Sequence, residues 1–168
     1  MKTEGFSPDA VTFTSALKAC GSIRFIDQGR KFHDEIVNRG MLLNDIVLGT
    51  SLVDMYAKCG MVMKAQEVLE SLPVRNIVSW NALIAGYAQQ GKCDEAVKCF
   101  EHMQIEGLSP NAITFASILK ACGSTKDIDK GMNIHTEIRS RGLLKKDIVL
   151  GNALVDMYSK CGMFSKAR

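Results

Sequence analysis

The hexapeptide LKACGS occupies residues 17–22 and recurs unchanged at residues 119–124, 102 positions further along the chain. Working outward from this phrase, residues 10–45 and 112–147 align without gaps and match at 20 of 36 positions. The segments that follow them, 46–66 and 148–168, match at 15 of 21 positions. Self-similarity at a fixed spacing is typical of repeat architectures. The sequence therefore predicts a stack of similar units.

A further unit of 35 residues, 77–111, lies between the two matching pairs. It closes with MQIEGLSPN, which echoes MKTEGFSPD at the start of the chain. Because the chain then begins and ends inside a unit, we expect it to be an excerpt of a longer protein, with any targeting segment outside it. The expected units are 1–9 (a tail), 10–45, 46–76, 77–111, 112–147 and 148–168 (truncated).

Each unit is expected to form two helices. Residues 78–89 carry apolar side chains at helical spacing, Gly91 interrupts them, and Asp94 is predicted to cap a second helix. The unit at 46–76 should have a shorter second helix that ends near Pro73. One hairpin cannot bury its own apolar face, so we predict an all-α, right-handed superhelical solenoid of stacked hairpins. Left-handed glycines should end the second helices of the longer units at Gly40, Gly107 and Gly142.

The composition fits a folded chain and excludes several classes of protein. Of 168 residues, 46% are apolar and 23% are charged, which argues against global disorder. The net charge of +3 is compatible with nucleic acid but is far from polybasic. No apolar run approaches the roughly 18 residues of a membrane span. The six cysteines form no C-x-x-C pair, so they are interpreted as small buried side chains in a reducing compartment.

Residues 77–87 read IVSWNALIAGY, and Ala96, Phe100 and Met103 follow before the closing phrase. This unit resembles the pentatricopeptide repeat along its whole length, and it lacks the W-x-x-L-G-x-x-Y opening of tetratricopeptide repeats. The unit 10–45 resembles the long variant of the family, and 46–76 resembles the short variant. Their alternation is similar to the P–L–S arrays of plant organellar RNA-editing factors. The resemblance implies P-type units at 77–111 and in the tail 1–9, L-type units at 10–45 and 112–147, and S-type units at 46–76 and 148–168.

The resemblance also implies single-stranded RNA as the ligand, with about one base read by each repeat. In the family, the fifth and last residues of a repeat face the Watson–Crick edge of one base, and the second residue packs between neighbouring bases. The implied base-reading pairs are Thr14 with Asp45 (guanine), Thr50 with Asn76 (adenine), Asn81 with Asn111 (pyrimidine) and Ala116 with Asp147 (spacing only); Asn152 and Asp9 lack partners within the chain. The implied base-sandwiching residues are Val11, Val47, Val78, Ile113 and Val149.

Each assignment has a simpler alternative. The second residues could be ordinary core residues, and the fifth residues could be surface residues of a first helix. Four lysines share the face of the fifth residue and are candidate phosphate contacts, or else solvated surface residues; they are Lys18, Lys58, Lys120 and Lys160. Asp54 and Asp156 lie on that face too, which weakens a simple basic groove.

The sequence offers no catalytic constellation, no metal site and no cofactor motif. His33 and His135 each begin an H-x-E, but the P-C-x-x-C of a zinc deaminase is missing, so these histidines are expected to pack between repeats. We therefore expect a non-enzymatic RNA-recognition array of a C-to-U editing factor of the mitochondrion or chloroplast. The alternative is a protein–protein scaffold that docks small editing-factor proteins on its L-type repeats. Uncapped solenoid ends could also support self-association.

Overall fold

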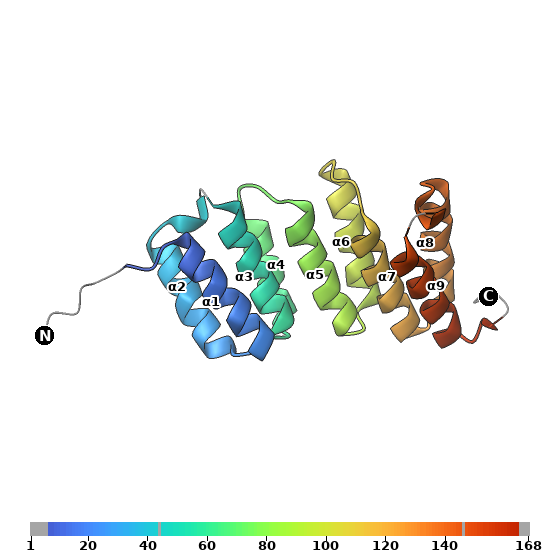
Figure 1. The fold of residues 1–168 in the computed structure, drawn as a ribbon, viewed down its shortest axis with the longest axis horizontal. Helices are drawn as coiled ribbons and strands as arrows, with labels where there is room; N and C mark the ends of the chain where they lie inside the picture. The colour runs from blue at the N-terminus through green and yellow to red at the C-terminus, as the bar shows by residue number, and fades with distance from the viewer. Residues whose placement is uncertain (1–6, 44, 146, 165–168) are drawn as a thin grey trace, which may run out of the picture. The chain divides into compact units, whose positions relative to one another are not determined.

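The computed structural model describes residues 7–43, 45–145 and 147–164. Within these residues the chain forms nine α-helices and two short 3-10 turns, without any strand (Figure 1). The predicted all-α class of stacked helical hairpins is thereby confirmed. The chain divides into two compact units, residues 1–75 and 76–168. No described helix is long and apolar enough to cross a membrane.

The first compact unit stacks two hairpins on each other. The first helix of one hairpin packs beside the first helix of the next, and each second helix covers its own first helix. The buried side chains along this contact include Phe13, Leu17, Leu48 and Leu52. In chain order the elements are α1 (Ala10–Ile23), α2 (Ile26–Asn38), η1 (Met41–Leu43), α3 (Ile46–Lys58) and α4 (Val62–Ser71). The short α4 ends before Pro73, as the sequence predicts.

The second compact unit repeats the same plan. The three first helices α5, α7 and α9 are neighbours in that order, and α6 and α8 pack behind them (Figure 1). Leu83, Ile84, Phe115 and Ile118 are fully buried between these layers. The elements are α5 (Ile77–Gln89), α6 (Cys93–Ile105), α7 (Ala112–Thr125), α8 (Ile128–Ser140), η2 (Leu143–Lys145) and α9 (Ile148–Lys160).

Two glycines of the repeated LKACGS phrase lie where neighbouring first helices approach each other closely. A Cβ atom placed on Gly21 would lie 3.3 Å from the Cα atom of Met55 on α3. A Cβ atom on Gly123 would lie 3.2 Å from the Cα atom of Met157 on α9. The glycine of the phrase thus permits the same close contact between backbones in both compact units.

One helix begins earlier than the sequence predicts. Gly91 adopts a φ of +67°, as a helix stop should, but α6 begins directly after Lys92, and Lys92 provides no side-chain cap. Asp94 is therefore the second residue of α6, and its predicted role as the cap is wrong. Its carboxylate Oδ1 instead lies 3.0 Å from Nζ of Lys130 on α8. The predicted left-handed glycines are confirmed, with φ values of +64° at Gly40, +79° at Gly107 and +67° at Gly142.

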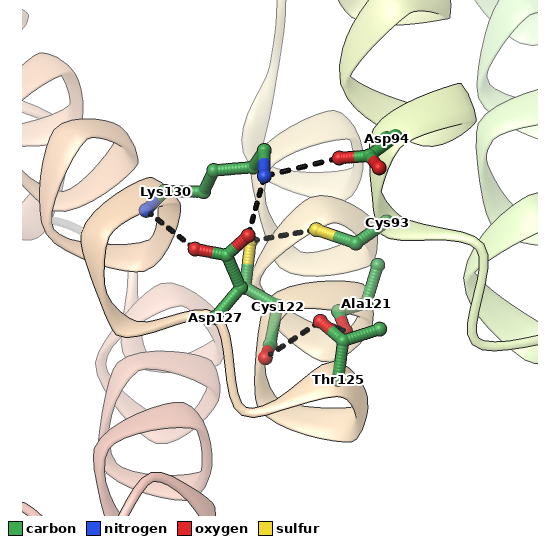
Figure 2. A network of polar contacts seen from close by, with 7 residues as sticks. All are labelled: Cys93, Asp94, Ala121, Cys122, Thr125, Asp127 and Lys130. Carbon is green, nitrogen blue, oxygen red and sulfur yellow. Dashed lines mark hydrogen bonds and ion pairs between the residues drawn. The ribbon is translucent and has the colours of Figure 1, made fainter.

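A polar network joins α6, α7 and α8 on the second unit (Figure 2). Lys130 bonds both Asp94 and Asp127, which raises the pKa of the lysine and lowers that of Asp127. Beside them, Sγ of Cys93 lies 3.3 Å from Sγ of Cys122. The hydrogen bond to Cys122 lowers the pKa of the Cys93 thiol, and the same bond together with burial raises the pKa of Cys122. The network ties one hairpin to the next through both charge and sulfur contacts.

Candidate nucleic-acid interface

The last residue of each expected unit before the truncated unit 148–168 is the N-cap of the next first helix. The five caps are Asp9, Asp45, Asn76, Asn111 and Asp147. Each has extended backbone, and its side chain accepts a hydrogen bond from a backbone N–H in the first turn. Asx residues are strongly preferred at this position because they satisfy otherwise unpaired amide groups. The predicted base-reading residues thus have a structural task that fixes where their side chains lie.

Capping uses only one atom of each of these side chains. In Asn76 and Asn111 the cap is made by Oδ1, with Ser79 N at 2.8 Å and Thr114 N at 3.1 Å, respectively. The amide nitrogen of each asparagine is then the group left for a ligand, and it can only donate. In Asp45 the single oxygen Oδ1 accepts from two backbone amides at 2.9–3.0 Å, so Oδ2 is left, and it can only accept. Asp147 repeats this arrangement.

The structure brings together one of the predicted fifth-and-last pairs through a direct hydrogen bond. Nδ2 of Asn81 donates to Oδ1 of Asn111 at 3.3 Å, and Asn81 is buried although it is polar. The hydroxyl of Thr114, which is fully buried, donates to Oδ1 of Asn81 at 2.7 Å and accepts from the backbone N–H of Asn111 at 3.1 Å. Three side chains from α5, α7 and the loop between α6 and α7 therefore form one polar cluster.

The other fifth residues differ. Thr14 and Asp45 share no hydrogen bond, and Ala116 has no polar side-chain atom to offer Asp147. Thr50 is buried, and its Oγ1 is the one buried side-chain oxygen or nitrogen of the described residues that lacks a hydrogen-bond partner. Buried polar atoms are almost always paired, so an unpaired hydroxyl needs a reason. Binding of a polar ligand atom would provide one. Asn152 is exposed to solvent on α9.

The predicted sandwiching residues all lie on the surface. Each is the second residue of a first helix, and their exposed fractions lie between 57% and 72%. The alternative interpretation of these side chains as core residues is therefore wrong. Each is a β-branched apolar residue at the same position of its first helix, so its exposure recurs with the repeat. These residues are Val11, Val47, Val78, Ile113 and Val149.

The four candidate phosphate lysines fall into two classes. Lys58 and Lys160 each form an ion pair one turn back, with Asp54 at 2.7 Å and Asp156 at 2.6 Å. Their positive charge is partly offset before any ligand arrives. Lys18 and Lys120, which occupy the long units, are exposed and form no ion pair among the described residues. The structure thus leaves two of the four lysines free for phosphate.

The histidines contact the next repeat, as expected for packing residues. Nδ1 of His33 lies 2.8 Å from the hydroxyl of Tyr56, and Nδ1 of His135 lies 2.7 Å from that of Tyr158. Across residues 7–43, 45–145 and 147–164, no cluster of three or more His, Cys, Asp or Glu side chains could hold a metal ion.

Thr114 is the part of this interface that sequence reasoning missed. Its signal was available, because an asparagine followed three residues later by a hydroxyl residue is a capping-box pattern. Asn76 with Ser79 forms the same box. The pattern identifies the cap, but only the packing of α5 against α7 shows that the Thr114 hydroxyl also reaches Asn81.

Comparison with known proteins places this geometry in a family. The PPR repeat model matches residues 11–41, 50–77, 113–143 and 152–168, and a PPR repeat family model matches residues 75–124. A pentatricopeptide repeat-containing protein of Arabidopsis thaliana is 38% identical over 168 residues, which is all of this chain and 24% of that protein. Another from the same plant, named as mitochondrial, is 41% identical over all of this chain and 26% of its own length. The chain thus spans about a quarter of these relatives.

Among solved structures, the crystal structure of the pentatricopeptide repeat protein PPR10 in complex with an 18-nt psaJ RNA element matches with a TM-score of 0.80. The two chains are 26% identical, and the match covers 98% of this chain and 24% of PPR10. The repeat models, the relatives and the helical fold agree, and the chain belongs to the pentatricopeptide repeat family.

Proposed function

We propose that this chain binds single-stranded RNA by sequence, with about one base facing each repeat. The observation that carries the proposal is the Asn81–Asn111 pair, whose side chains are joined by a hydrogen bond of 3.3 Å near the N-terminal ends of α5 and α7. Val78 and Ile113 are exposed in the first turns of the same two helices. Sequence-specific binding of an unstacked base requires polar groups that hydrogen-bond to the edge of the base. It also requires rigid apolar side chains that pack against the two faces of the base. The RNA in the PPR10 complex supports the same ligand class for this chain.

The cap chemistry supports the base proposed for each repeat. Oδ2 of Asp45 can only accept, which suits the N–H groups on the Watson–Crick edge of guanine. Asn111 presents an amide donor, which suits the acceptors of a pyrimidine. Thr50 has a hydroxyl without a partner, which can donate to adenine N1. The proposed core is 5′-(G)-A-Y-N-3′, where Y is C or U.

The test is a fluorescence-anisotropy titration at low salt with RNAs of about ten nucleotides. One RNA contains 5′-GAC-3′, a second replaces the A facing Thr50 by G, and a third replaces the C facing Asn81 by G. We expect the first RNA to bind roughly tenfold more tightly than either of the others. Equal binding of all three would contradict this register of the code.

Single-residue variants distinguish recognition of a particular base from sequence-independent binding of RNA. Asn81→Ala should remove the preference at the third base, and Thr50→Ala the preference at the second. Asn133→Ala is the matched control, because Asn133 is exposed on the second helix α8 and should not touch RNA. A chain that is helical by circular dichroism but binds none of the RNAs would contradict the proposal.

The wider role we propose is that of the recognition array of a C-to-U RNA-editing factor with alternating P, L and S repeats, acting in the mitochondrion or chloroplast. The chain would bind and not catalyse, with the chemistry supplied elsewhere. The mitochondrial names of relatives support an organellar location.

A second candidate function is a protein scaffold, and one observation favours it. A groove of about 530 Å³ lies on the first compact unit between α2 and α4, and Val37, Leu43 and Val68 give it an apolar lining. Small editing-factor proteins docking at the L-type repeat would use this surface. Val37→Asp should abolish such docking while RNA preference is retained.

A further inference from the structure

Two buried cysteines face each other where α6 of one repeat packs against α7 of the next (Figure 2). Sγ of Cys93 lies 3.3 Å from Sγ of Cys122. A disulfide has a sulfur–sulfur distance of about 2 Å, so a movement of about 1 Å brings the two atoms within bonding distance. Cys122 lies in the last turn of α7, whereas Asn111 caps the start of that helix. The thiol pair is therefore separate from the candidate nucleic-acid interface.

The two thiols differ in how readily they lose a proton. The hydrogen bond with Cys122 is the largest cause that lowers the pKa of the Cys93 thiol. The Thr125 hydroxyl and the Lys130 ammonium group lower this pKa further, against the opposing effects of burial and of Asp127. The hydrogen bond between the sulfurs, followed by burial, raises the pKa of Cys122. Because the thiolate is the nucleophilic form, Cys93 is the attacking sulfur and Cys122 keeps its proton.

Cys93 is also the sulfur that an oxidant meets first. It is 4% exposed, whereas Cys122 has no exposed surface. Cys93 is the first residue of α6, where the helix dipole favours a thiolate, and the preceding Lys92 makes no side-chain cap. A helix end without a cap opens easily, and hydrogen peroxide is small enough to enter through a narrow opening. Bulkier oxidants, such as glutathione disulfide, need a wider one.

We propose that Cys93 and Cys122 form a peroxide-reactive site, in which Cys93 attacks the oxidant and Cys122 resolves the product to a disulfide between neighbouring repeats. The Cys93 thiolate attacks one oxygen of hydrogen peroxide, the O–O bond breaks, and the departing hydroxide takes up a proton to become water. Cys93 is then a sulfenic acid. The sulfur of Cys122 next attacks the sulfur of Cys93, and the displaced hydroxide leaves as water with the proton of Cys122. Two thiols are thus oxidised to one disulfide while one peroxide is reduced to two water molecules.

Two more exposed cysteines provide an internal comparison. Cys59 and Cys161 are only partly buried, yet burial raises the pKa of each thiol. Sγ of Cys59 lies 3.9 Å from Sδ of Met55, a thioether that cannot complete a disulfide. Sγ of Cys161 lies 4.0 Å from Sδ of Met157 in the same way. If exposure alone decided the reaction, these two thiols would be oxidised before Cys93.

The experiment treats the reduced 168-residue chain with an equimolar amount of hydrogen peroxide at neutral pH. The remaining thiols are blocked with N-ethylmaleimide, and unreduced peptides are mapped by mass spectrometry at successive times. We expect the Cys93–Cys122 disulfide to form roughly tenfold faster than Cys59 or Cys161 is oxidised. A thiol reductant should restore both thiols. Oxidation of Cys59 or Cys161 at an equal or greater rate would overturn the proposal.

Two single variants assign the roles of the sulfurs. Cys122→Ser keeps a hydrogen-bond donor beside Cys93 but lacks the resolving sulfur, so Cys93 should stop at the sulfenic acid, which dimedone traps. Cys93→Ser lacks the attacking sulfur, so oxidation of Cys122 should slow by about tenfold. Undiminished oxidation of Cys122 in the second variant, or a folded first variant without a dimedone adduct, would show that the roles are wrong. Should either variant fail to fold, the order of oxidation in the wild type still decides the question.

Discussion

The sulfur atoms of Cys93 and Cys122 lie 3.3 Å apart, in contact across the interface between α6 and α7. Both residues are buried, and the thiols are free. Because the two side chains already face each other, little movement is needed for them to react together (Figure 2).

We expect diamide to convert this pair to a disulfide, with the reagent taking up the two hydrogens that the thiols lose. Peptide mapping by mass spectrometry without reduction should find Cys93 linked to Cys122. Cys20 is the matched control, because it occupies the position of Cys122 in the preceding long unit, where Sγ of Cys59 contacts its backbone carbonyl oxygen at 3.8 Å. Equal cross-linking of Cys20 would show that proximity in the fold does not direct the reaction.

The pair of His33 and Tyr56 should make stability depend on pH. Burial lowers the pKa of His33 below its ordinary value of 6.5, with the positive charge of Lys64 as a second cause. The unfolded chain therefore takes up this proton first as pH falls. The contribution to stability is complete above about pH 6.5 and is lost as pH falls through the folded pKa. Urea unfolding at pH 8 and pH 5 should show this loss, and His33→Gln should reduce it. An unchanged pH dependence in the variant would contradict the assignment.

Gly49 and Gly151 share one register but should respond differently to alanine. Among the residues that the structure describes, a Cβ atom on Gly151 meets nothing within 4 Å, so Gly151→Ala should stabilise α9 by about 0.5–1 kcal/mol through helix propensity. A Cβ atom on Gly49 would lie 2.6 Å from Cδ2 of Leu72, which must move. The Gly49→Ala variant should therefore be stabilised less than the Gly151→Ala variant, or be destabilised. Chemical denaturation of both variants measures the difference, and equal gains would be the contrary result.

Val78→Ala should weaken RNA binding without destabilising the fold. Val78 is 57% exposed, so the free energy of unfolding should change by less than about 0.5 kcal/mol. Loss of two methyl groups against base faces should cost about 1.5 kcal/mol, roughly tenfold in Kd. Ile105→Ala is the control, because Ile105 is 81% exposed on the second helix α6. If both variants bind RNA like the wild type, the valine does not contact bases.

Lys120 and Lys160 should contribute differently to the salt dependence of RNA binding. Lys120→Ala should reduce the slope of log Kd against log salt by about 0.7, the value for one phosphate contact on a single strand. Lys160→Ala should reduce it less, because Asp156 lies 2.6 Å from its ammonium group. Asp156→Asn frees that lysine and should steepen the slope. Identical slopes for the two lysine variants would argue against the distinction.

The repeat and its helices could be read from the sequence because they depend on local and periodic signals. LKACGS recurs with the period of the repeat, whereas the Asx caps and the left-handed glycines that follow most of the helices act within a few residues of the helix ends. The one wrong helix boundary is the start of α6. The sequence allows this helix to begin either after Lys92 or after Asp94, and the two positions are only two residues apart. The backbone turn after Gly91 decided between them.

Tertiary structure decided which of the repeated side chains reach each other. From the sequence, Val78 could equally have been core, and its exposure is set by how neighbouring first helices pack. Likewise, the pairing of Lys58 with Asp54 separates two lysines that the sequence treats alike. The link from Thr114 to Asn81 joins residues 33 positions apart, and no local pattern specifies it. The sequence by itself determined the repeating hairpin, since helix formation and capping are local; the donors and acceptors left for a ligand were decided only when α5 and α7 packed together.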